Sequence, residues 1–300
     1  MNAPAFYTAM PASTRAAILM TISAMTYALT FVTVRALSET FSVYQLVFLR
    51  AAIGTAVMLP WLCRSGVHAL RTTRWKIYGS RAFLVYSGNL CWFYALAEMA
   101  LADATALSFL VPVFTTLILS VWMRERLTGP RIVALFLGLA GAFVLIRPGF
   151  AEIGLATIAM MYTTVSYGAA TAQTRVLAKT ENSNVVVFYM FALNAPLALG
   201  PGLYHWTMPV GGLDWGLIAA FGLLSLCSQM FMTKSLALAE AAVVMPCFYL
   251  QLPLAGLFGF FLFAQVPEIW LLPGAILIIG GSYYSVWSES RRRRLAEEAA

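Results

Sequence analysis

The sequence contains little charge. Asp, Glu, Lys and Arg make up only 10% of its 300 residues, whereas a soluble domain carries about 25% of these residues. Hydrophobic residues account for 61% of the chain. This composition excludes a soluble globular protein and predicts an all-α integral membrane protein, because about 20 apolar residues cross a bilayer as a helix. The length allows about ten such helices and leaves no room for a soluble domain.

Histidine and cysteine are also scarce. The two histidines, His68 and His205, fall in loops or at span ends, and the four cysteines are scattered singly through apolar runs. Neither residue type shows the spacing of metal ligands, so we expect no metal, no cofactor and no His-based catalysis. A membrane-embedded enzyme would need His, Asp or Cys clustered at membrane depth. The sequence therefore predicts a protein that is not an enzyme.

Ten apolar stretches predict the membrane helices. Their approximate bounds are 16–36, 43–63, 77–97, 103–123, 131–148, 153–175, 184–205, 214–234, 241–263 and 268–288. We divide the chain into an N-terminal segment 1–15, a first five-helix unit 16–148, a second five-helix unit 149–288 and a C-terminal tail 289–300.

The basic residues predict the topology. With the N-terminus placed in the cytoplasm, all but three of the 19 Lys and Arg fall on the cytoplasmic side; the exceptions are Arg35 and Arg147 outside and Arg50 within a span. The positive-inside rule then predicts that both termini are cytoplasmic. The formal charge of +7 follows from these span-end residues. Because they form no basic stripe, we expect no nucleic-acid binding.

The two five-helix units resemble each other in sequence. Identical residues recur at offsets of 139 and 140 positions; the pairs include Phe109 with Phe248, Gly141 with Gly280, Tyr27 with Tyr167 and Arg35 with Arg175. Because five is an odd number of spans, the second unit would lie upside down relative to the first. This is the arrangement of transporters built from inverted repeats.

Several short motifs carry a family resemblance. They are Tyr27-Ala28, Phe31 and Arg35 in the first span, Arg50 in the second, Pro112 in the fourth with the following Glu125-Arg126-Leu127, and Gly141 in the fifth. With these motifs the chain resembles the EamA family of the drug/metabolite transporter superfamily, and most of all its YddG-type aromatic amino acid exporters. The resemblance implies ten helices with pseudo-twofold symmetry, a central cavity and export of amino acids or related metabolites. Two positions depart from the family pattern: Tyr27-Ala28 replaces Trp-Gly, and Ala264 replaces a glutamate.

Arg50 is the one charge that the pattern places clearly within a span. An ionisable group at membrane depth is costly, which makes it a candidate for function. It could bind a substrate carboxylate in a charge-assisted pair. The alternative is that it caps backbone carbonyls or extends toward the headgroups, and the sequence leaves both readings open.

Polar and aromatic residues that share one helical face are further candidates for lining the cavity. They are Tyr78, Tyr86, Asn89 and Phe93 in the third span, Tyr162, Ser166 and Gln173 in the sixth, and Ser228 and Gln229 in the eighth. Such side chains either line a cavity or form hydrogen bonds between helices, which are worth about 0.6 kcal/mol each in a membrane.

Three prolines interrupt predicted spans, namely Pro112 in the fourth and Pro246 and Pro253 in the ninth. A proline removes a backbone hydrogen bond and kinks a helix. We therefore expect the fourth and ninth helices to serve as gates.

The resulting hypothesis is a bacterial inner-membrane transporter. It would export small metabolites, most of all neutral and aromatic amino acids, by alternating access through a central cavity, with the substrate and the lipid bilayer as partners and the oligomeric state left open. One alternative is a multidrug exporter of lipophilic cations, which would need a membrane-embedded acid that the sequence does not show. A second is a non-transporting assembly subunit. The same lack of an acid at membrane depth predicts transport down the substrate gradient without proton coupling.

Overall fold

The computed structural model describes residues 12–122, 129–146, 154–177, 181–238, 247–248, 250–266 and 268–298. Two of the features considered above, Pro246 and the motif at 125–127, lie outside these residues. In the described part the helices are joined by short turns and loops, and there is no β-strand. An all-helical fold is therefore confirmed.

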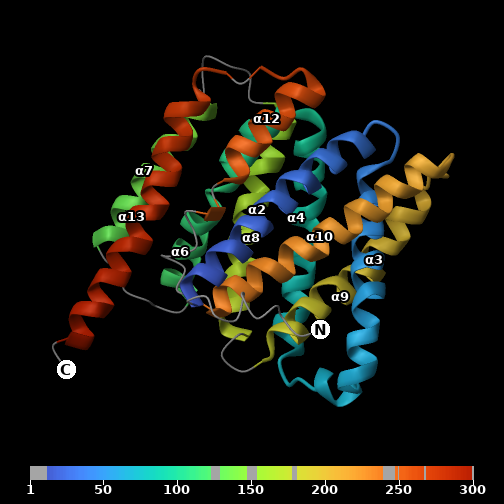
Figure 1. Cartoon of the computed structure of the whole chain (residues 1–300), viewed down its shortest axis with the longest axis horizontal. Coiled ribbons are helices and arrows are strands. Elements are labelled where there is room, and N and C mark those ends of the chain that lie inside the picture. Colours follow the sequence, from blue (N-terminus) through green and yellow to red (C-terminus); the bar gives the residue numbers. More distant parts are fainter. Residues whose placement is uncertain are drawn as a thin grey trace.

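The helices occur at each of the ten predicted positions (Figure 1). They are α2 (Ala12–Leu37), α3 (Val43–Ser65), α4 (Trp75–Glu98), α5 (Leu101–Ser108), α6 (Val111–Trp122), α7 (Gly129–Ile146), α8 (Leu155–Leu177), α9 (Ser183–Tyr204), α10 (Gly212–Leu238), α12 (Gln251–Phe263) and α13 (Leu271–Glu298), with a short 3-10 helix η1 (Val67–Leu70) between α3 and α4. α5 and α6 together occupy the fourth predicted span.

Four segments of the described helices are both long and apolar enough to cross a membrane. They are Thr14–Leu37, Val43–Ser65, Asn184–Tyr204 and Gly212–Ser235. Shorter apolar helices lie at Leu101–Thr115, Gln251–Phe263 and Leu271–Gly281. α4 is more polar than these helices because it contains Lys76, Arg81 and Asn89. An ionisable residue within a span is a candidate for function, which applies here to Arg81.

The fourth predicted span is divided in two. α5 ends at Ser108, a turn occupies residues 109–110, and α6 begins at Val111. Pro112 is the second residue of α6, so its ring would clash with the carbonyl group of Ser108 if the helix were continuous. The interruption thus agrees with the expected effect of this proline. Pro253 differs, because it lies in the first turn of α12, where a missing N–H costs little.

The last helix is longer than predicted. The expected span ends at residue 288, but α13 continues to Glu298 through the four consecutive arginines. Arg, Leu, Ala and Glu are all strong helix formers. The polar end of the chain therefore extends the helix past the apolar segment.

The packing of the helices follows the sequence repeat. α2 packs along α10, and the counterparts of these helices in the other unit, α8 and α4, pack along each other. In the same way, α6 packs on α8 and α12 packs on α2. Two further pairs, α3 with α9 and α7 with α13, join counterparts directly and lie at opposite sides of the bundle in Figure 1. Exchanging the two units maps this set of contacts onto itself.

The counterparts α3 and α9 run in opposite directions. The hydroxyl of Ser42, just before α3, donates to the carbonyl oxygen of His205, just after α9, at 3.1 Å. At the other end, the rings of Trp61 near the end of α3 and Phe188 near the start of α9 have centroids 6.5 Å apart. A twofold axis that relates α3 to α9 must therefore run roughly perpendicular to these two helices, because it reverses their direction.

Small residues allow the close approach of α7 to its neighbours. A Cβ atom on Gly138 would lie 2.6 Å from a methyl group of Val113 on α6, and one on Gly141 would lie 2.6 Å from the carbonyl oxygen of Gly274 on α13. Close packing through small residues is typical of membrane helix pairs. The α7–α13 pair therefore has the features of a scaffold.

Candidate functional site

The candidate site is centred on Arg50, the eighth residue of α3. The N-terminus of this helix is fixed by Ser42, whose side chain accepts a hydrogen bond from the backbone N–H of Gln45. Two turns further on, Nη1 of Arg50 donates to Oδ1 of Asn89 on α4 at 3.3 Å. The guanidinium carbon also lies 5.2 Å from the ring centroid of Phe191 on α9, within the range of a cation–π interaction. The structure thus brings together Arg50 and Asn89, two residues that the sequence singled out separately.

Two tyrosines related by the sequence repeat approach this arginine. Tyr167 on α8 donates its hydroxyl hydrogen to Oδ1 of Asn89 at 2.6 Å. Tyr27 on α2 and Tyr167 both lie within electrostatic range of the Arg50 guanidinium. These positions are 140 residues apart in the sequence. The pseudo-twofold relation therefore places equivalent hydroxyl groups near one cation.

Aromatic rings continue from Tyr27 along α2 and α4. The centroid of Tyr27 lies 6.0 Å from that of Phe31 and 5.7 Å from that of Phe248. Phe31 in turn packs edge-on against Trp92 of α4 at 5.1 Å. Rings at these distances and tilts interact favourably with one another and provide faces and edges for an aromatic ligand.

Two glycines make room for the side chains around Arg50. A Cβ atom on Gly88 would lie 2.8 Å from Cε1 of Tyr167, and one on Gly54 would overlap the ring of Phe191. Both residues are helical, so the reason for glycine is the close approach of an aromatic ring. The positions of Tyr167 and Phe191 therefore depend on the absence of side chains at residues 88 and 54.

The arrangement has a definite binding chemistry. A guanidinium group in an apolar interior is stabilised by anions and by hydrogen-bond acceptors. In the described structure Arg50 has one side-chain hydrogen bond and one aromatic face, so its remaining donors could hold a carboxylate. The neighbouring rings could hold a planar group attached to that carboxylate.

The other predicted cavity residues are distributed over several places. Phe93 packs against Phe221 of α10 at 5.6 Å, and Tyr86 contacts the same large core cluster. Ser166 is buried beside Gly88. Ser228 is buried between α10 and α2, where its carbonyl oxygen accepts from Ser23 at 2.9 Å. The remaining four candidates make none of the contacts that the structure describes for Arg50.

Tyr162 has an exposed fraction of 43% and donates to Ser87 at 2.9 Å on the outside of the α4–α8 pair. The backbone oxygen of Gln229 accepts from Thr233, and its side chain is only half-buried. Tyr78 lies eleven residues before Asn89 on α4, about three turns away, and Gln173 on α8 donates to Ser80, nine residues before Asn89. None of these four residues contributes to the group around Arg50.

Sequence reasoning missed several residues of the site. Tyr27 and Tyr167 were noted as a matched pair, and Phe31 as part of a family motif, but none was selected as a candidate. The 140-residue offset between the two tyrosines was a usable signal, because symmetry-related residues meet at the repeat interface. Arg81 was not selected as a candidate either. It was counted with the charges on the cytoplasmic side, and it lies buried inside α4 with an exposed fraction of 7%.

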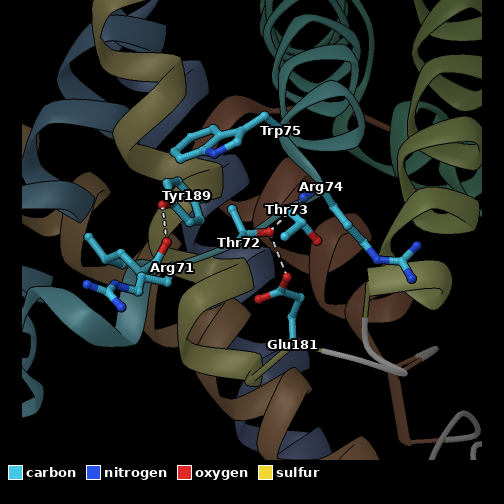
Figure 2. A pocket seen from close by; sticks show the side chains of 8 residues that line it. Arg71, Thr72, Thr73, Arg74, Trp75, Glu181 and Tyr189 are labelled. Carbon is cyan, nitrogen blue, oxygen red and sulfur yellow. Dashed lines mark hydrogen bonds between the residues drawn. The ribbon is translucent and has the colours of Figure 1, made fainter.

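The end of the bundle where α4 begins is called the Trp75 end. A surface pocket lies at this end. Its volume is about 820 Å³, and it is lined by Leu70, Arg71, Thr72, Thr73, Arg74, Trp75, Glu181 and Tyr189 (Figure 2). The hydroxyl of Thr72 donates to a carboxylate oxygen of Glu181 at 2.7 Å, and that of Tyr189 donates to the carbonyl oxygen of Leu70 at 2.7 Å. Both bonds join the first unit to the second. Figure 2 shows the Arg71 and Arg74 side chains extending away from each other.

The chain is similar in sequence to known transporters. The sequence model of the EamA-like transporter family matches it twice, over residues 14–147 and 154–287. The chain belongs to this family. The family is one of transporters, which agrees with the prediction of a protein that is not an enzyme.

Curated relatives of this EamA-like protein transport several kinds of small molecule. A riboflavin transporter of Brucella anthropi is 29% identical, with 83% of this chain and 89% of the relative covered. An S-adenosylmethionine uptake transporter of Rickettsia felis is 23% identical (83% and 84% covered), and a pseudopaline exporter of Pseudomonas aeruginosa is 26% identical (87% and 92% covered). A crystal structure with 20% identity and a TM-score of 0.65 covers 93% of this chain and 98% of its own and shares the fold. A transporter of small metabolites is therefore supported.

Proposed function

We propose that this EamA-like protein exports small metabolites that combine an aromatic or apolar group with a carboxylate, with aromatic and neutral amino acids as the first candidates. The observation that carries the proposal is the position of Arg50. Its guanidinium lies between Asn89 and the ring of Phe191. A carboxylate would bind the guanidinium through charge-assisted hydrogen bonds, and the side chain of an aromatic amino acid would contact the rings of Tyr27 and Phe31.

The relatives support the same chemical class in part. S-adenosylmethionine contains an amino acid group and an aromatic base, and riboflavin is a planar aromatic compound. A second candidate substrate is therefore a flavin-like ring compound. It would depend on the aromatic residues more than on Arg50, because riboflavin has no carboxylate.

Alternating access would follow from an inverted arrangement of the two units in the membrane. The antiparallel packing of α3 and α9 supports this arrangement.

We place the Trp75 end in the cytoplasm of a bacterial inner membrane, because Arg64, Arg71, Arg74 and Lys76 all lie there. Both chain termini would then be cytoplasmic.

Cysteine labelling tests this orientation. In a variant without the four native cysteines, Thr40→Cys and Ser65→Cys would place one thiol at each exposed end of α3. A membrane-impermeant maleimide added to intact cells should label Thr40→Cys and should label Ser65→Cys only after the membrane is opened. The reverse pattern would contradict the proposed topology.

Transport in proteoliposomes tests the function itself. Purified protein should accelerate the efflux of labelled phenylalanine or tryptophan well above the rate in empty liposomes. Riboflavin and the lipophilic cation tetraphenylphosphonium would be measured in parallel, with Arg50→Gln as the variant that lacks the proposed anchor. Saturable flux of the cation alone would favour the multidrug alternative. No flux of any compound would favour the non-transporting subunit.

The multidrug alternative has less structural support. A buried carboxylate is the usual partner of a lipophilic cation in a membrane. Among the side chains that the structure describes, the buried set contains Arg81 and several neutral polar residues but no Asp or Glu. A site whose buried charge is positive favours anionic or zwitterionic substrates.

A further inference from the structure

Arg81 is a second buried cation in α4. Its exposed fraction is 7%, and its Nε donates to the hydroxyl of Thr174 on α8 at 2.9 Å. No carboxylate pairs with it among the residues for which the structure describes the side chain. A buried charge with one neutral partner is expensive. An ionisable group buried in a membrane helix is a candidate for function beyond holding α4 against α8.

Two neighbouring polar groups also lack partners. Tyr78 lies one turn before Arg81, has an exposed fraction of 1%, and makes no hydrogen bond through its hydroxyl within the described structure. On α8, the amide nitrogen of Gln173 donates to Ser80 at 3.0 Å, while its side-chain oxygen is buried without a donor from any described residue. Buried polar groups in native proteins nearly always have a partner. An unpartnered hydroxyl and an unpartnered amide oxygen thus lie close to a buried guanidinium whose one hydrogen-bond partner is neutral.

These groups lie between the surface pocket and Arg50. Trp75 borders the pocket in Figure 2, and Tyr78, Arg81 and Asn89 follow it along α4. Arg81 and Asn89 are eight residues apart on one face of the helix, a distance of about 12 Å. Tyr189 forms a wall of the pocket, and its ring packs on Tyr78 with a centroid distance of 4.6 Å. The Tyr78–Tyr189 pair therefore leads from the pocket wall to the turn of α4 that carries Arg81.

We propose that Arg81, Tyr78 and Gln173 form a second substrate-binding site on the transport path. Arg81 and the Tyr78 hydroxyl would hold the carboxylate of the substrate, and the Gln173 oxygen would accept from its ammonium group. The site would take amino acids and related zwitterions that pass between the pocket and Arg50. This inference rests on the proposed function, because it assigns the same substrate class to a new position.

Binding to purified protein in nanodiscs separates the two sites. The probe is 4-fluorophenylalanine, followed by ¹⁹F NMR, with size-exclusion chromatography to confirm that each variant is folded. Arg50→Gln removes the first site and should retain saturable binding. The double variant Arg50→Gln with Arg81→Gln should lose that residual binding.

Three variants in the Arg50→Gln protein examine the contacts. Tyr78→Phe keeps the ring but removes the hydroxyl and should weaken residual binding several-fold. Gln173→Leu should weaken 4-fluorophenylalanine but leave 3-phenylpropionate, which has no ammonium group, unchanged. Thr174→Val is the matched control, because it removes the structural partner of Arg81 and keeps the guanidinium. It should leave residual binding within about twofold of the Arg50→Gln protein.

The outcomes distinguish the second site from the proposed function. Complete loss of binding in Arg50→Gln would overturn the second site and leave the proposed function standing. Equal loss in Arg81→Gln and Thr174→Val would also overturn it, since the role of Arg81 would then be to join α4 to α8. Absence of binding to the unmodified protein would overturn both proposals for this substrate class.

Discussion

The hydroxyl of Tyr167 donates to Oδ1 of Asn89 at 2.6 Å, and the same oxygen accepts from Arg50 at 3.3 Å. One amide oxygen thus links three helices, α3, α4 and α8. Two donors on a single acceptor restrict its rotation, so the orientation of the Arg50 guanidinium depends on Tyr167 even though the two side chains share no direct bond. Removing the Tyr167 hydroxyl should therefore change the binding of any ligand held by Arg50.

Tyr167→Phe is the first test of this relationship. The substitution keeps the ring and deletes one hydrogen bond, whose net worth is about 0.5–1.5 kcal/mol, or roughly two- to tenfold in affinity. We expect the KM for phenylalanine efflux from proteoliposomes to rise within that range. Tyr162→Phe is the matched control, since Tyr162 is also on α8 and also donates to α4, through Ser87, but is exposed. Equal changes in the two variants would refute a specific role for Tyr167.

Gly88→Ala tests the same relationship from the other side. The new methyl group would lie 2.8 Å from Cε1 of Tyr167 and would force the ring away from Asn89. We expect a loss of transport at least as large as that of Tyr167→Phe, with the protein still folded. Gly79→Ala is a control on the same helix, because nothing lies within 4 Å of its added Cβ. Unimpaired transport by Gly88→Ala would show that the position of the Tyr167 ring does not matter.

Arg50→Lys tests the proposed anchor. Lysine keeps the charge but loses the planar fork that binds a carboxylate through two hydrogen bonds and stacks on an aromatic ring. Efflux of phenylalanine should therefore fall strongly, whereas efflux of phenylalaninamide, which has no carboxylate, should be little affected by the change. Arg35→Lys serves as the control, because Arg35 bonds only to the carbonyl oxygen of Leu96 in the described structure. Normal phenylalanine transport by folded Arg50→Lys would assign Arg50 a structural role.

The positions of the helices could be predicted from the sequence because apolar length and span-end charges determine them. The break between α5 and α6 could be anticipated from Pro112, whose effect is local. The end of α13 was not predicted: the helix continues ten residues past the predicted end of the span, since hydropathy reports where a span ends and not where a helix ends. The local sequence was therefore enough to predict where the helices lie and where the fourth span breaks, but not where the last helix ends.

The site was less predictable because it depends on contacts between distant residues. Arg50 and Asn89 were each recognised by type, but their hydrogen bond joins positions 39 residues apart, and nothing in either local sequence indicates it. Tyr27 and Tyr167 could be found only by treating the repeat as a symmetry operation. Arg81 was counted only as a charge on the cytoplasmic side, because it lies near the end of its predicted span. Its burial results from the packing of α4 against α8.

The last prediction concerns energy coupling. A proton-driven carrier needs a titratable group that links proton binding to substrate binding, and a carboxylate or His within the membrane usually serves. The side chains that the structure describes include no buried Asp or Glu, and Glu98 at the end of α4 is exposed; Glu240 lies outside the described residues. We therefore expect facilitated transport down the substrate gradient. With equal phenylalanine on both sides of the proteoliposome membrane, an imposed pH gradient should cause no net accumulation. Sustained uphill accumulation that a protonophore abolishes would refute this prediction. If Glu240→Gln then abolished the uphill accumulation and Glu98→Gln did not, Glu240 would be the coupling residue.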